Sequence, residues 1–164
     1  MTHIVIRPAT DADGDRIAAL ISACFAEYPG CVFERAAEFP ELDAIATHFA
    51  ARGGAIWVAD GDEPVVGSLA AAPTEVPGTI ELFKMYVARP ARRGGLASAL
   101  LARAIAFARG RQARRVRLWT DTRFLDAHRF YERHGFVRQP GERALHDLSD
   151  SREYPYCLRL AADH

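Results

Sequence analysis

The chain has 164 residues, of which 49% are hydrophobic, and this suits one compact domain over residues 1–164 with a substantial core. Its 21 basic and 21 acidic residues balance, so no overall field favours nucleic acid or anionic lipid. The first residues lack a basic leader followed by an apolar run, and no uncharged stretch is long enough to cross a membrane. We therefore expect a soluble, cytoplasmic protein without nucleic-acid or membrane partners.

Residues 4–6 favour a short strand, and a capping-box pattern at residues 10–13 begins the first helix. Its apolar stripe over residues 17–25 recurs at helical spacing and stops near Tyr28-Pro29-Gly30. A second helical stripe over residues 42–49 ends at Gly53-Gly54. The first part of the chain is thus predicted to be a strand followed by two helices.

Three extended runs come next, at residues 55–59, 65–72 and 79–87, with short turns that predict an antiparallel meander. A wide apolar stripe from residue 96 to 108 predicts a helix that ends at Gly110. This helix allows a strand at residues 116–120 to lie parallel to the strand at 79–87. A helix at residues 127–134 and a strand at 153–160 complete the series.

The turn between the strand at 79–87 and the next helix has the chemistry of an anion site. Gly94 and Gly95 let the backbone approach a ligand, and the unpaired amides of a helix start favour a diphosphate. A dinucleotide-binding fold would also need an acid after the next strand, a place that Asp121 could take. However, three antiparallel strands before the turn and one crossover after it are too little chain for a doubly wound sheet.

Two motifs give this turn a context. Arg92-x-x-Gly95-x-Ala97 resembles the signature with which the GNAT superfamily of N-acetyltransferases holds the pyrophosphate of acetyl-CoA. The run from Phe130 to Phe136 resembles the family's aromatic-Tyr-x-(Lys/Arg)-x-Gly-Phe stretch. The resemblance implies an α+β fold of order β-α-α-β-β-β-α-β-α-β(-β). Its mixed, mostly antiparallel twisted sheet would have a central parallel strand pair splayed around acyl-CoA.

The resemblance also implies an activity: transfer of an acetyl group from acetyl-CoA, as co-substrate, to a primary amine by direct attack in a ternary complex. Tyr131 would be the general acid, and Phe130 a core aromatic. Glu81 is the candidate base, and strand periodicity places it on one face with Phe83, Met85 and Val87. The implied acetyl-CoA contacts are Met85, Tyr86, Val87, Arg92, Arg93, Gly94, Gly95, Leu96, Ala97, Phe124 and Ala127.

One departure concerns Phe124, which stands where the family often has an asparagine that contacts the cofactor, so packing on the pantetheine arm is its expected role. The acceptor side is expected at Tyr28, Cys31, His146 and Asp147. His146 or a water chain is an alternative base. A homodimer is a further expectation from the family.

Two other functional classes remain for comparison. A non-catalytic acyl-CoA-binding or sensing module would keep the glycine turn but need neither Glu81 nor Tyr131. A metal or cysteine hydrolase is not favoured, because His128 and His134 are six residues apart rather than four. Cys24, Cys31 and Cys157 form no Cys-x-x-Cys pair or even disulfide set. No metal is therefore expected.

Overall fold

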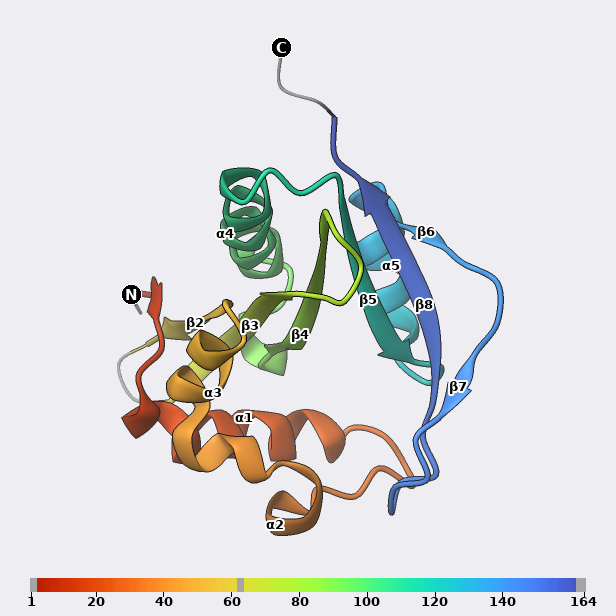
Figure 1. The fold of residues 1–164 in the computed structure, drawn as a ribbon. Coiled ribbons are helices and arrows are strands. Elements are labelled where there is room, and N and C mark those ends of the chain that lie inside the picture. Colours follow the sequence, from red (N-terminus) through yellow and green to blue (C-terminus); the bar gives the residue numbers. More distant parts are fainter. Residues whose placement is uncertain (1–2, 62–63, 162–164) are drawn as a thin grey trace.

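A computed structural model describes residues 3–61 and 64–161 of the chain. Its strands form one twisted sheet in the order β1-β2-β3-β4-β5-β8-β6, with β7 paired to β8 (Figure 1). The strands are β1 (Val5–Pro8), β2 (Ala55–Asp60), β3 (Val65–Pro73), β4 (Thr79–Val87), β5 (Arg115–Asp121), β6 (Val137–Arg138), β7 (Arg143–Ala144) and β8 (Arg152–Arg159). The helices are α1 (Gly14–Phe25), α2 (Arg35–Glu38), α3 (Ile45–Ala51), α4 (Leu96–Gly110) and α5 (Leu125–Arg133), with 3₁₀ turns η1 (Asp11–Asp13), η2 (Pro40–Ala44) and η3 (Arg89–Ala91).

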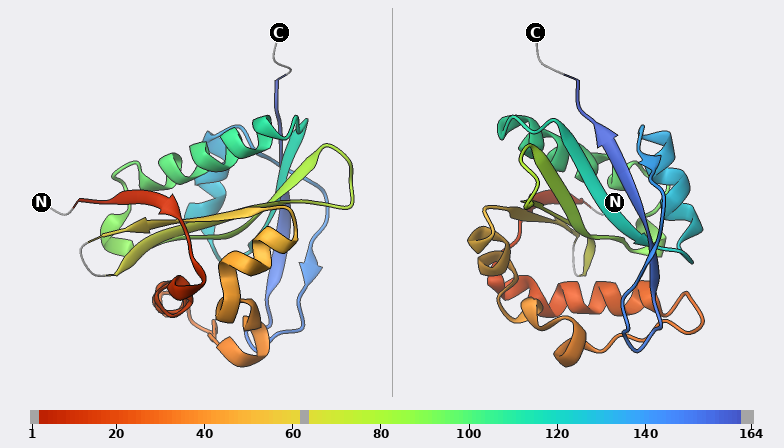
Figure 2. Two further views of the ribbon diagram at one scale, coloured as in Figure 1. Left: turned by 60° about the vertical axis from the view of Figure 1, so that its left-hand side comes forward. Right: turned by 45° about the vertical axis from the view of Figure 1, so that its right-hand side comes forward.

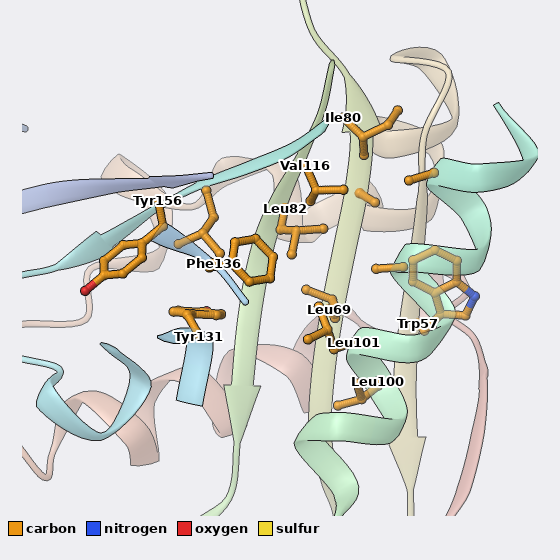
Figure 3. Close-up of a cluster of buried hydrophobic side chains, with 14 of the residues drawn as sticks. Trp57, Leu69, Ile80, Leu82, Leu100, Leu101, Val116, Tyr131, Phe136 and Tyr156 are labelled. Atoms are coloured by element: carbon orange, nitrogen blue, oxygen red, sulfur yellow. The ribbon is translucent and has the colours of Figure 1, made fainter. Parts of the chain in front are cut away.

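Helices cover both faces of the sheet, as the left view of Figure 2 shows, with α4 on one side and α1 and α3 on the other. Strand β3 is buried on both sides because its alternate residues face two separate cores. Leu69 and Ala71 pack in the core under α4, whereas Ala70 and Ala72 pack in the core under α1 and α3. The α4 core continues between α5 and the sheet, where the side chains of Tyr131, Phe136 and Tyr156 lie together (Figure 3).

The pair β4 and β5 is the parallel pair that the sequence predicts, since α4 provides the crossover. The mixed α+β fold with a mostly antiparallel sheet is confirmed. Parallel pairing covers only residues 79–81 of β4 against 115–117 of β5. Beyond these residues the two strands separate, and the separation lies next to the turn that leads into α4.

A β-bulge in β4 corrects one prediction from periodicity. Ala70 of β3 pairs with Phe83, but Ser68 pairs with Tyr86, so β4 contains one extra residue in this stretch. The bulge lies at Lys84, whose φ of 55° is left-handed, and the Ser68 hydroxyl donates to the Lys84 carbonyl at 2.6 Å.

The extra residue exchanges the faces of the strand. Met85 and Val87 pack with Leu82 in the α4 core, whereas Phe83 packs on the α1 side. The prediction that Glu81 and Phe83 share a face with Met85 and Val87 is therefore wrong.

Smaller differences concern the edges of the fold. The second predicted helix is divided into η2 and α3, and the short elements α2, β6 and β7 were not predicted. Each has five or fewer residues, too few for hydrophobic periodicity to reveal.

Candidate active site

A cavity of about 410 Å³ opens where β4 and β5 separate. Its walls come from the end of β4, the turn and first residues of α4, and the length of α5, with one side closed by Cys24 of α1 and by Tyr28 just after that helix. Ten residues expected from the sequence line it, namely Met85, Tyr86, Val87, Arg92, Arg93, Gly95, Ala97, Phe124, Ala127 and Tyr131. Segments about forty residues apart in sequence thus form one cavity.

The turn before α4 presents its backbone to this cavity. Gly95 is the N-cap of α4 and has a φ of 83°, a left-handed conformation that glycine adopts without strain. Arg93 is also left-handed, at 69°. The first amides of α4 have no partners within the helix and carry the positive end of its dipole. This end of the cavity is suited to a phosphate group.

Two members of the expected turn act differently. Leu96 turns its side chain into the α4 core, where it is buried, and Gly94 is exposed beside the cavity. Neither residue is among those that line the cavity.

The side chain of Arg92 is turned toward α1 rather than left free. Its Nε donates to the Val87 carbonyl at 2.9 Å, and its two terminal nitrogens donate to Glu27 at 2.6 and 2.7 Å. This bidentate pair joins the turn to the end of α1. Glu27 offsets the Arg92 charge, and Asp126 pairs with Arg129 at 2.8 Å, so the further cations that line the cavity are Arg93 and Arg133.

Tyr131 lies at the inner end of the cavity and is only 6% exposed. Its ring packs against Phe136, with centroids 5.6 Å apart, and against Tyr156 at 6.1 Å (Figure 3). Burial raises the pKa of the Tyr131 phenol, so it remains protonated at neutral pH. The phenol is therefore held in one place as a potential proton donor.

Phe124 forms part of the cavity wall. It is the N-cap residue of α5, and its ring packs on Tyr28 with centroids 4.7 Å apart. Tyr28 was predicted on the acceptor side, and the structure places it in the wall of this cavity as well. An apolar wall replaces the amide that an asparagine would offer.

The two predicted acceptor loops meet. The buried Ser149 hydroxyl donates to the Val32 carbonyl at 3.1 Å and accepts from the Val32 amide at 2.7 Å. The Leu148 amide donates to Glu38 at 2.8 Å. Residues far apart in sequence are thus joined, and Cys31 lies beside this junction.

The predicted residues of these loops have different environments. Asp147 accepts a hydrogen bond from the Ser151 amide at 2.7 Å, whereas His146 is exposed with a left-handed φ of 53°. Burial raises the pKa of the Cys31 thiol. Asp147 therefore helps to fix its loop, and His146 lies on its outer side.

Glu81 lies in the wall of a second cavity, of about 510 Å³, which also includes Arg117 and Trp119. The Arg117 Nε donates to Glu81 at 2.6 Å, and the same guanidinium contacts Glu75. The structure therefore separates Glu81 from the Tyr131 cavity and gives it an ion-pair partner.

Comparison with known proteins decides the family. Residues 15–136, more than half of the chain, match the model of the acetyltransferase (GNAT) family. This chain belongs to the GNAT family. A GNAT-type fold follows from this membership.

Relatives of this GNAT chain include two curated mammalian proteins. It is 35% identical over 100 residues to human N-acetyltransferase 8, in a match that covers 58% of this chain and 44% of the human protein. It is 33% identical over 100 residues to N-acetyltransferase 8B of Rattus norvegicus, covering 58% and 45%. The chain spans less than half the length of the curated relatives it matches.

Solved structures show the same fold. A GNAT acetyltransferase of Staphylococcus aureus superposes with a TM-score of 0.81 at 19% identity, over 97% of this chain and 100% of that one. An acetyltransferase of Streptococcus agalactiae gives 0.77 at 25% identity, over 97% and 98%. PaiA N-acetyltransferase of Thermoplasma acidophilum, determined in complex with coenzyme A, gives 0.76 at 15% identity, over 96% and 99%.

Sequence reasoning about this GNAT chain missed several cavity residues. These are Cys24, Ser98, Asp126, Arg129 and Arg133, together with Phe130, which was expected only in the core. Spacing offers a signal for part of the set, because residues 126, 129, 130 and 133 repeat at helical intervals around Tyr131. Cys24 comes from α1, which no local motif connects to the turn.

Over residues 3–61 and 64–161 of this GNAT chain, no helix is long and apolar enough to cross a membrane. The same described residues contain no group of three or more His, Cys, Asp or Glu side chains placed to hold a metal ion.

Proposed function

We propose that this protein transfers an acetyl group from acetyl-CoA to a primary amine by direct attack on the thioester in a ternary complex. The observation that supports this most is that one cavity combines an anion-binding helix start with a protonated tyrosine. Binding alone would need the helix start but not a buried proton donor at the other end. Family membership adds acyl transfer as the general activity.

Binding of the donor is assigned to two parts of the cavity. The amides at the start of α4, with Arg93, would hold the diphosphate. The separated backbone from Met85 to Val87 would bond the pantetheine amides, since beyond residue 81 it is not paired with β5. Phe124 and Ala127 offer the apolar surface for the connecting arm.

Catalysis needs a neutral amine, stabilisation of a negative oxygen, and a proton for the leaving thiolate. Holding both substrates in place supplies much of the rate. Tyr131 would donate the proton to the departing sulfur. Glu81 and His146 stay predictions for the base, and neither lines the cavity that contains Tyr131 among the described residues.

The test is release of free CoA thiol when the purified protein is mixed with acetyl-CoA and a panel of amines. We expect thiol release together with a mass increase of about 42 Da in one amine, because an acetyl group replaces a hydrogen atom on nitrogen. Binding of CoA without thiol release for any amine would instead identify a sensing module and contradict the proposal.

We further propose that the chain acts in the cytoplasm, works as one domain over residues 1–164 and forms a homodimer. Sedimentation of the purified protein tests the last of these.

A further inference from the structure

The face of β4, β5 and β8 opposite α5 forms a ladder of chemically active side chains. Figure 1 looks onto this face: α5 lies behind β5 and β8, and in the described part of the chain no helix covers these two strands from the front. Along the ladder, Arg117 lies opposite Cys157, Trp119 opposite Pro155, and Asp121 opposite Glu153. This face connects the second cavity at one end with the acceptor loops at the other.

The strand register sets the last step of the ladder level with Tyr86 of the donor cavity, and neither Asp121 nor Glu153 is among the residues that line this cavity. Glu81 pairs with Arg117, and Asp121 lies four residues further along β5. On β4 the same advance, with one extra residue for the bulge, leads to Tyr86. Tyr86, which lines the donor cavity, is therefore level with Asp121 and Glu153 across the separation of the strands.

Electrostatics supports this placement. Burial raises the pKa of the Tyr86 phenol most, and the carboxylates of Glu153 and Asp121 are among the charged groups that raise it further. The direction of this shift agrees with the register, which sets Asp121 and Glu153 across the strand separation from Tyr86.

Glu153 is held in a defined position on this face. Its side chain is 16% exposed, and Arg143 of β7 donates to Oε1 through Nε at 2.9 Å and contacts the same oxygen through Nη2 at 2.8 Å. The Arg143 guanidinium in turn lies 4.1 Å above the Trp119 ring. Both contacts are to Oε1, so they orient the carboxylate while leaving Oε2 outside the ion pair.

The neighbouring acids have different roles. Arg123 donates to both oxygens of Asp121, at 2.8 and 2.9 Å, and this bonding outweighs burial and lowers the pKa of Asp121. Burial, with the nearby Asp121 and Asp147, raises the pKa of Glu153 despite Arg143. The pKa values of these two adjacent carboxyl groups move apart. Such a pair is typical of sites in which one carboxylate, here Asp121, keeps its charge while the other, here Glu153, exchanges protons.

We propose that Glu153 is the catalytic base that takes the proton from the acceptor amine, with Asp121 and Asp147 favouring a cationic acceptor. This inference rests on the proposed function. The acceptor ammonium first gives one proton to Glu153, which passes it to solvent. The neutral amine nitrogen then bonds to the acyl carbon as the carbon–sulfur bond breaks, and the sulfur takes the proton of Tyr131. The nitrogen loses a second proton, which restores Tyr131 by way of solvent, so the net products are an amide, the free thiol and one released proton.

The other candidates are placed less well for this task. Glu81 is bonded to Arg117 at the paired end of β4 and β5, five residues before Tyr86 on its strand. His146 is exposed on the outer side of its loop. Among the described residues, Glu81 and Glu153 each have one carboxylate oxygen outside their arginine ion pair, so position decides between them: Glu153 is level with Tyr86, whereas Glu81 lies at the paired end of the strands.

The test compares Glu153→Gln with the matched control Glu142→Gln, using the best amine from the thiol-release panel. Glu142 is an exposed glutamate whose carboxylate also pairs with an arginine, Arg152, at 2.8 Å. We expect Glu153→Gln to lose about 10²-fold in kcat/KM at pH 7, with unchanged affinity for CoA. Its rate should recover as pH rises, because the free amine then forms without a base. Glu142→Gln should lose less than about threefold.

A second variant keeps the inference testable if Glu153→Gln does not fold. Arg143→Met removes the cation facing Glu153 but keeps the carboxylate, while Asp121, Asp147, Arg123 and Tyr86 remain around it. Because Arg143 lowers the pKa of Glu153, its removal should move the acid limb of the pH–rate profile upward. An unmoved limb, or an unchanged rate in Glu153→Gln, would overturn this inference and leave the proposed function standing. Silence of the native protein with every amine would overturn both.

Discussion

The donor cavity and the acceptor face are built in different ways, although they meet at one gap. The cavity is formed mainly by two short stretches, residues 85–98 and 124–133. The face that we propose receives the acceptor collects single side chains from β4, β5, β7 and β8 and from two loops joined by Ser149. In the proposed function a local motif therefore binds the donor, whereas acceptor specificity depends on the whole sheet.

The largest expected effect is that of Tyr131→Phe. Removing the phenol removes the proton donor but keeps the packing on Phe136 and Tyr156. We expect kcat to fall by about 10²-fold or more, with the Kd for CoA within about twofold of the native value. Steady-state kinetics and calorimetric titration with CoA check this. An unchanged kcat would remove Tyr131 from the mechanism.

A substitution in the turn should affect only the donor half. Gly95→Val places a branched residue at a φ of 83°, which costs about 1–3 kcal/mol although its Cβ would meet no atom within 4 Å. The strain should displace the α4 amides and raise the Kd for CoA about tenfold. Gly110→Ala at the other end of α4 is the matched control, since its Cβ is also free but its backbone is helical. Equal Kd values for the two variants would contradict the role of the turn.

The acceptor half is tested by Ser149→Ala. This variant loses both hydrogen bonds to Val32, worth about 1 kcal/mol each, and so loosens the junction of the two loops. We expect KM for the amine to rise several-fold while the Kd for CoA stays the same. If CoA affinity fell equally, the division of the site into two halves would be wrong.

The smallest effect on CoA binding and on amine turnover is expected from Asp13→Asn. Asp13 pairs with Arg7 of β1, the strand at one edge of the sheet. Arg7 donates to both Asp13 oxygens at 2.9 Å, and this lowers the pKa of Asp13 to about 2. A lowered pKa stabilises the fold above about pH 4 and loses this contribution as pH falls toward 2. Asp13→Asn should therefore cost roughly 2 kcal/mol of unfolding free energy at pH 7, with kcat unchanged.

The measurement for Asp13→Asn is denaturant unfolding across that pH range. The native protein should lose stability between about pH 4 and pH 2 more steeply than the variant does. Parallel curves would show that this ion pair contributes nothing to the acid sensitivity.

Much of the fold could be predicted because long elements repeat their hydrophobic pattern. Helix α4 and strands β3 and β4 were found within a residue or two of their observed ends, and the crossover by α4 implied a parallel β5. Short elements such as β7 have too few residues to show a period. Their position depends on β8, with which β7 pairs.

The bulge at Lys84 shows why periodicity failed at the site. A single extra residue, fixed by the buried Ser68 of a neighbouring strand, changes which side chains face which core. Nothing in the local pattern of β4 marks it, because apolar residues are found on both of its faces. The placement of Glu81 on one face with Met85 and Val87 depended on unbroken alternation and lost its basis there.

By itself, the sequence determined the turn from Arg92 to Ala97 and the helix with Tyr131, since glycine conformation, helix dipoles and aromatic spacing are local properties. It also determined the mixed sheet through the order of its elements. The tertiary structure alone decided that Arg92 is bound to Glu27, that Glu81 faces away from the donor cavity, and that Glu153 lies level with Tyr86. Those relations depend on register between strands and on contacts between distant segments, which no local pattern contains.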